Sequence, residues 1–134
     1  MLFSTAAYLA LIIWCIFLAG ACEGIMDAIS FRPWNFYGKD YWDPRYSWKR
    51  KWKDGDEKQG EWFCGSSRWF VFITDGWHFM KFCRNLFATL AATFLLAIFI
   101  GFWLSLLLTI SARLVYWLGF HILFEKEYYK KIWN

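Results

Sequence analysis

The stretch that decides the fold is residues 86–110, LFATLAATFLLAIFIGFWLSLLLTI. It contains 15 Leu, Ile or Phe residues and no ionisable side chain. On an insertion scale of about −0.3 to −0.6 kcal/mol for each such residue, these side chains favour the bilayer by roughly 4–9 kcal/mol. An α-helix rises about 1.5 Å per residue, so about 20 residues cross a hydrocarbon core of ~30 Å. The stretch therefore predicts a membrane-spanning helix.

A second uncharged run, residues 2–21, is long enough to span a bilayer as well. The 134-residue chain is 59% hydrophobic and 19% charged, whereas soluble domains are roughly 45–50% apolar and about 25% charged. This composition excludes a disordered chain, a disulfide-packed miniprotein and an ordinary soluble enzyme. We predict an all-α membrane protein with two transmembrane helices, residues 1–22 and 86–110, joined by an aromatic-rich interfacial helical layer.

Two further segments complete the predicted organisation. Residues 23–85 form a Trp- and Lys-rich interfacial segment with short helices, and residues 111–134 form a juxtamembrane amphipathic segment. The apolar stretch 114–124 is too short to cross a membrane alone. It either prolongs the second span or bends near residues 111–113 and lies on the membrane surface, and of the two we favour the bend.

The basic residues predict the orientation. Residues 23–85 contain 11 of the 15 Lys and Arg residues, and cytoplasmic loops are enriched in these residues. With two spans, the long segment then lies in the cytoplasm and both ends of the chain lie outside, as expected for a bacterial inner-membrane protein. The net charge of +4 suits anionic lipid rather than nucleic acid, because acidic residues alternate with the basic ones.

Tryptophan is concentrated in the segment between the predicted spans. Indole rings prefer the headgroup level of a bilayer, where the ring is dehydrated and its N–H still finds a partner. The aliphatic parts of lysine and arginine side chains cover apolar neighbours there, while their charged groups stay in contact with water. We therefore expect a layer that lies on the membrane, with these interfacial residues: Trp34, Trp42, Trp48, Trp52, Trp62, Trp69 and Trp77.

Four ionisable residues are candidates for chemistry at the membrane surface. Ser66 or Ser67 is expected to begin a helix that continues into the second span, which places Asp75 and His78 on one face. Glu23 and Asp27 share a face on a helix that continues out of the first span. If these helices pack together, the four side chains can bind a divalent metal, in the manner of carboxylate–histidine sites in helical bundles. The alternative is structural: Asp75 pairs with a nearby base, and the others are solvated.

No other cofactor is expected, and the chain contains no motif for nucleophilic catalysis or phosphate binding. Both absences disfavour an enzyme. Gly76, inside the expected helix, indicates a close backbone contact or a bend at that point.

Small residues recur at helical spacing in both predicted spans. Helices in lipid associate by close backbone approach at such residues, because lipid offers no hydrophobic force between them. The spacing predicts helix packing, and a homo-oligomer or a place in a larger membrane complex, through Gly20, Gly24, Ala97, Gly101 and Ser105.

Three motifs in residues 47–80 resemble a family of small uncharacterised membrane proteins from bacteria and their phages. The motifs are a Ser-Trp-basic segment that begins at Ser47, the pair Ser66-Ser67, and Thr-Asp-x-Trp-His at residues 74–78. Arg50 stands where that family is expected to have Asn. The resemblance implies a membrane location and draws attention to Asp75 and His78, but it implies no activity.

The function expected from these features is that of a structural or interaction component of a membrane. One alternative is a metal-binding protein or enzyme that uses the four ionisable residues named above. Another is a holin-like, pore-forming phage product.

Overall fold

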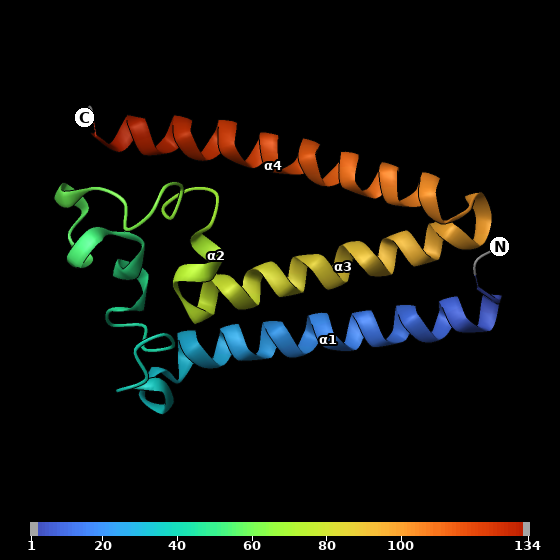
Figure 1. The fold of residues 1–134 in the computed structure, drawn as a ribbon, viewed down its shortest axis with the longest axis horizontal. Coiled ribbons are helices and arrows are strands. Elements are labelled where there is room, and N and C mark those ends of the chain that lie inside the picture. The colour runs from blue at the N-terminus through green and yellow to red at the C-terminus, as the bar shows by residue number, and fades with distance from the viewer. Residues whose placement is uncertain (1–2, 133–134) are drawn as a thin grey trace. The chain divides into compact units, whose positions relative to one another are not determined.

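Helices dominate the described part of the chain. The structure is a computed structural model that describes the backbone of residues 3–132 and the side chains of residues 3–119 and 122. Four α-helices follow one another: α1 (Thr5–Phe31), α2 (Val71–Thr74), α3 (Gly76–Ile100) and α4 (Phe102–Ile132) (Figure 1). Between α1 and α2 lie four 3-10 helices: Pro33–Phe36, Ser47–Lys51, Lys53–Gly55 and Glu57–Gln59. Residues 3–132 contain no β-strand, which confirms the predicted all-α class.

Among the described residues, three helices are long and apolar enough to cross a membrane: α1, α3 and the Phe102–Gly119 part of α4. Their most apolar windows have mean hydropathies of 2.2, 1.8 and 1.4, and only 17%, 11% and 11% of the residues in these windows are buried in the chain. An apolar helix that its own chain leaves uncovered needs an apolar environment. The three helices are therefore compatible with the predicted membrane location.

The second predicted span is divided between two helices. We predicted one helix over residues 86–110, but α3 ends at Ile100 and α4 begins at Phe102. Gly101 between them has a φ of 84°, a conformation that glycine adopts at little cost. The chain reverses its direction there (Figure 1). The prediction was wrong because the composition of the run gives its length but does not reveal that one glycine inside it forms a turn.

The segment 111–134 was expected to prolong the second span or to bend near residues 111–113. The helix α4 passes through these residues without a break as far as Ile132, so they prolong a helix, and the favoured bend is absent. Most side chains that would give this segment an amphipathic face lie outside the described residues.

Contacts divide the described residues into two compact units. The first consists of the residues up to Ile13 and those from Thr89 onward, and the second consists of Trp14–Ala88. Both α1 and α3 contribute residues to each unit.

In the first unit, buried hydroxyl groups join α3 to α4. The Thr93 Oγ1 and Thr109 Oγ1 atoms lie 2.7 Å apart. Both side chains are buried, and each hydroxyl also lies 2.9 Å from a backbone carbonyl one turn earlier in its own helix. Because a hydroxyl has one proton, one threonine donates to the other, which donates to its own carbonyl. A polar contact of this kind holds two helices together in lipid, where hydrophobic burial cannot.

The residues predicted to pack helices have different environments. Ala97 and Ser105 are buried in the first unit, whereas Gly101 forms the turn. Gly20 and Gly24 lie on an open face of α1, because a Cβ built at either position would meet no atom within 4 Å. The close helix approach predicted at these two glycines is therefore not made within the described chain.

In the second unit, the C-terminal half of α1 and the start of α3 are linked by an ion pair. The Arg84 Nη1 atom donates to Glu23 Oε2 at 2.5 Å. The two helices lie side by side, and residues 32–70 fold over their ends as turns and 3-10 helices (Figure 1). We call residues 32–75 the head segment.

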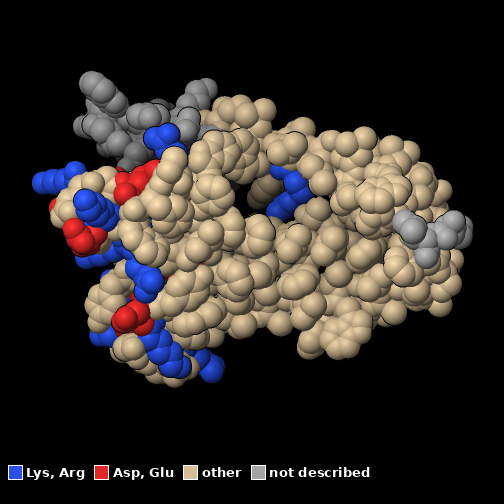
Figure 2. Space-filling model, in the orientation of Figure 1, with Lys and Arg blue, Asp and Glu red and all other residues tan. Residues whose placement is uncertain are grey.

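Charge is concentrated on the head segment. Figure 2 shows blue and red side chains gathered over it, whereas the flanks of the long helices are almost entirely tan on the face drawn. Acidic and basic side chains alternate on this surface, so neither sign forms a large uniform patch.

Candidate functional site

Asp75 separates α2 from α3 and caps the longer helix. Its backbone is extended, with φ −153° and ψ 158°, and its Oδ1 accepts the backbone N–H of His78 at 3.0 Å. An aspartate in this position satisfies one of the amides that a helix leaves unpaired at its start. The prediction of a helix that runs from Ser66 or Ser67 into the second span was therefore wrong. The short helix α2 begins only at Val71, and the extended backbone of Asp75 separates it from α3.

Asp75 and His78 are in direct contact. The Nδ1 atom of His78 lies 2.7 Å from Oδ2 of Asp75, and the carboxylate is 2% exposed whereas the imidazole is 30% exposed. An ionised carboxylate can only accept, so the Nδ1 atom of a neutral imidazole donates to it. In the neutral form of His78 this contact holds the proton on Nδ1, so that Nε2 carries the lone pair on the opposite side of the ring.

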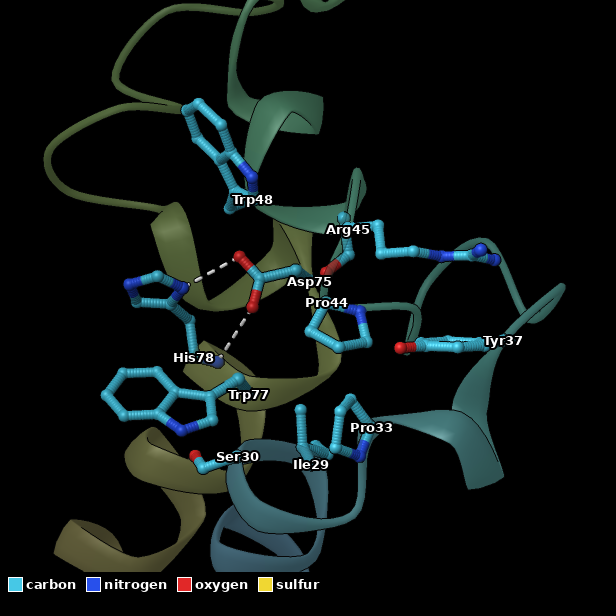
Figure 3. Close-up of a pocket in the computed structure, with 11 residues that line it drawn as sticks. Ile29, Ser30, Pro33, Tyr37, Pro44, Arg45, Trp48, Asp75, Trp77 and His78 are labelled. Carbon is cyan, nitrogen blue, oxygen red and sulfur yellow. Dashed lines mark hydrogen bonds and ion pairs between the residues drawn. The ribbon is translucent and has the colours of Figure 1, made fainter.

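A pocket of about 480 Å³ lies beside this pair. Figure 3 shows His78 between the indoles of Trp48 and Trp77, with the Asp75 carboxylate directed toward it. The end of α1 and two prolines form the opposite side. The lining residues are Ile29, Ser30, Pro33, Tyr37, Pro44, Arg45, Ser47, Trp48, Asp75, Trp77 and His78.

Asp43 holds together the loop that forms one wall of the pocket. This carboxylate is fully buried and accepts hydrogen bonds from the Gly38 amide at 2.9 Å and the Arg45 amide at 3.1 Å. The Nε and Nη2 atoms of Arg45 also donate to it, at 3.0 and 2.7 Å. The hydrogen bond from the Arg45 side chain holds the pKa of Asp43 well below its ordinary value.

Arg45 is neutralised by this arrangement. Its guanidinium carbon lies 3.8 Å from the centre of the Tyr37 ring and 4.9 Å from that of Tyr46, and Figure 3 shows the guanidinium directed away from Asp75. The pocket therefore has an arginine in its wall but no unbalanced positive charge from that residue. The sequence analysis missed the Asp43–Arg45 pair, although Asp-Pro-Arg is a turn sequence that points to a local carboxylate bond.

The structure does not bring the four predicted metal ligands together. Glu23 bonds Arg84, and Asp27 lies exposed on α1, whereas Asp75 and His78 bond each other. Among the described residues, no group of three or more His, Cys, Asp or Glu side chains is placed to hold a metal ion. The expected four-residue site is thus not formed, because an arginine that the helical spacing could not reveal occupies the carboxylate of Glu23.

The seven tryptophans predicted at the interface differ in exposure. Trp42, Trp52 and Trp77 are partly buried. Several indoles have a lysine ammonium over the ring, at 5.6 Å for Lys49 on Trp48 and 5.1 Å for Lys81 on Trp77. The more exposed members, which are 48–64% exposed, are Trp34, Trp48, Trp62 and Trp69.

A second, more open groove of about 430 Å³ lies on the head segment. It follows a short hairpin in which the Lys53 amide donates to the Gly60 carbonyl and the Trp62 amide donates to the Lys51 carbonyl. The groove combines basic and indole side chains, as a surface that meets anionic lipid does. Its lining residues are Arg50, Trp52, Lys53, Asp54 and Trp62.

Comparison of the chain with protein-family models, curated proteins and solved structures finds no match. The resemblance of residues 47–80 to the small bacterial and phage membrane proteins therefore stays a prediction.

Proposed function

We propose that this chain is a small integral membrane protein that acts as an interaction component, with the head segment at the membrane surface and the pocket beside Asp75 as its ligand site. The observation that carries the proposal is the set of three apolar helices that the chain itself leaves largely uncovered. Such helices gain their stability from lipid and from other helices. The described site supplies binding groups without a recognisable nucleophile, which favours binding over catalysis.

We infer three spans rather than two. The Phe102–Gly119 part of α4 contains nine Leu, Ile, Phe or Val residues and one charge, Arg113. The nine contribute about −3 to −5 kcal/mol to insertion, and an arginine costs about 2.5–3.5 kcal/mol at the centre of a helix. Insertion of this segment alone is therefore close to balanced. The hydroxyl contact between Thr93 and Thr109 favours its insertion together with α3.

The distribution of basic residues supports this topology. Residues 1–31 and 85–112 contain no Lys or Arg. With three spans, the start of α1 and the Gly101 turn share one side, and that side carries no basic side chain. The head segment and the end of α4 share the other side, which carries the basic residues that flank the spans. By the positive-inside rule the latter is the cytoplasmic side, so the head segment faces the cytoplasm.

The Glu23–Arg84 pair is consistent with this placement. Each residue lies eight positions from the head-segment end of its helix, or about 12 Å at 1.5 Å per residue. Ionisable side chains at that depth are costly unless they are paired, and the 2.5 Å contact pairs them. From Arg84 to Ile100, α3 has 17 residues, about 25 Å of helix, which is close to the thickness of the hydrocarbon core.

The topology is tested with Cys64, which is exposed on the head segment. We expect a membrane-impermeant maleimide to label Cys64 in inside-out vesicles, and a reporter fused after Asn134 to be cytoplasmic. A Cys64→Ser variant is the labelling control. Two spans would place the reporter on the opposite side from Cys64, so a reporter on the side opposite to the labelled Cys64 would refute the three-span arrangement and leave the membrane location intact.

Association of copies is the second part of the proposed function. Gly20 and Gly24 form an open strip on α1 that nothing in the described chain covers, and small residues four apart let a second helix approach closely. We expect Gly24→Leu to lower the oligomeric fraction several-fold in mild detergent, as measured by light scattering with size exclusion. Ile13→Leu, an exposed apolar change on the same helix, is the matched control. A wild-type chain that is monomeric and captures no membrane partner would contradict this part.

A further inference from the structure

We propose that the pocket beside Asp75 and His78 binds a primary ammonium group, as found in an ethanolamine headgroup. This inference rests on the proposed function, because the membrane arrangement places the pocket at headgroup depth. Ile29 and Ser30 lie in the last turn of α1, and Trp77 and His78 lie in the first turn of α3. The volume of about 480 Å³ is within the range of small-ligand sites.

The charge of the lining favours a cation. Asp75 contributes a buried carboxylate, and the one arginine in the lining is bonded to Asp43 through two nitrogen atoms. The negative charge of Asp43 and the positive charge of Arg45 neutralise each other within the wall of the pocket. In the described structure, no Lys or Arg side chain bonds the carboxylate of Asp75, whose partner is His78. Asp75 is therefore the charged lining residue that no Lys or Arg neutralises.

His78 supplies the acceptor. In the neutral form of His78, the Nδ1 proton is directed to Asp75, and Nε2 carries its lone pair on the side of the ring that faces away from Asp75 (Figure 3). A primary ammonium has three N–H donors for such an atom. The Asp75 carboxylate stabilises the imidazole as it accepts from a cation, so the two residues act as one polar unit.

Aromatic rings supply the walls. The Trp48 and Trp77 indoles flank His78 (Figure 3), and cations are attracted to the faces of such rings. Each of these indoles already has a lysine ammonium within 6 Å of its ring centre, which shows that the ring faces accept cations. The site thus suits a ligand with an ammonium group.

The two kinds of wall predict the specificity. Indole faces alone attract primary and quaternary ammonium groups alike, whereas His78 can bond only a group that carries N–H. A hydrogen bond to a charged group contributes enough to change affinity by about tenfold or more. We therefore expect ethanolamine headgroups to be preferred over choline headgroups by about tenfold, and both to be preferred over glycerol headgroups.

The test is lipid binding by the full chain in detergent, measured by native mass spectrometry. The probes are phosphatidylethanolamine, phosphatidylcholine and phosphatidylglycerol with identical acyl chains, with free ethanolamine as a soluble competitor. His78→Phe keeps a ring and removes the acceptor, so the preference for ethanolamine over choline should fall to about one. Trp48→Ala should weaken binding of both ammonium lipids. Trp69→Ala, an exposed indole that lines neither of the two pockets, should change neither.

The outcomes separate the two proposals. Competition by free ethanolamine would support the site and identify the ammonium alone as the ligand, whereas retention of phosphatidylethanolamine against it would support a lipid ligand. Equal or tighter binding of phosphatidylglycerol would overturn the inference, and so would an unchanged preference in a folded His78→Phe chain. If that variant does not fold, an unchanged lipid profile of Trp48→Ala overturns it. Topology and oligomeric state are measured in separate experiments, so a failure of the ammonium proposal would leave the proposed topology and association untouched.

Discussion

Replacing Gly76 by alanine is expected to destabilise the packing of the head segment against the start of α3. A Cβ at this position would lie 2.1 Å from Cε3 of Trp42, and 2.5 and 2.6 Å from Cδ2 and Cζ3 of the same ring. The Gly76 amide also donates to the Tyr41 carbonyl at 2.8 Å, so the backbone cannot move away without losing that bond. Overpacking of this kind costs about 1–3 kcal/mol, and occasionally more.

A double-mutant cycle can show whether the clash with Trp42 causes the loss of stability in Gly76→Ala. If the clash with the indole is responsible, Trp42→Leu should remove most of the cost of Gly76→Ala, which gives a coupling energy of about 1 kcal/mol or more. Gly20→Ala is the matched control, because a Cβ there meets no atom within 4 Å and alanine favours a helix by up to about 1 kcal/mol over glycine. Thermal unfolding in detergent provides the measurement. Equal effects of the two alanine substitutions would mean that Trp42 does not lie against Gly76.

The contact at Gly76 shows what the sequence could predict. A glycine inside an apolar, otherwise helical pattern indicated a close backbone contact or a bend, and both are confirmed, since Trp42 lies against Gly76 and the chain is extended at Asp75. The proximity of Asp75 and His78 was expected for the wrong reason. They meet because Asp75 caps α3, and not because both are inside one helix.

The remaining errors have a common cause. Hydrophobic length and helical spacing are local properties, so they predicted apolar helices and the faces of single elements. They could not reveal which partner a side chain meets across the fold. Arg84 binds Glu23, and Gly101 turns the chain inside an uninterrupted apolar run. Each of these depends on backbone geometry or on residues distant in sequence.

Asp43→Asn is expected to destabilise the head segment at neutral pH and to make little difference in strong acid. The carboxylate is fully buried and accepts from two amides and from two nitrogens of Arg45. An asparagine has one acceptor oxygen, and its NH₂ group would face donors. Bonds to an ionised acceptor are about twice as strong as neutral ones. We therefore expect the unfolding temperature at pH 7 to fall by about 5–10 °C.

The pH dependence of stability follows from the direction in which folding shifts the pKa of Asp43. Because the hydrogen bond from the Arg45 side chain lowers the pKa of Asp43 in the folded protein, this group stabilises the fold fully above its ordinary pKa. That contribution is lost as the pH falls through the lower, folded value. The unfolding temperatures of wild type and variant should differ by a constant amount above about pH 5, and should converge below about pH 4. Asp40→Asn, an exposed carboxylate on the same segment, is the control.

Glu61 is the carboxylate that could mimic this behaviour. Hydrogen bonds from the Ser67 hydroxyl and the Gly65 amide lower its pKa as well, so it also contributes stability that acid removes. It differs from Asp43 in its partners, which are neutral groups of its own loop. If acid sensitivity persists undiminished in Asp43→Asn and disappears in Glu61→Gln, the loop at residues 61–67 is the acid-labile element. Asp43 would then order the wall of the pocket without controlling its response to pH.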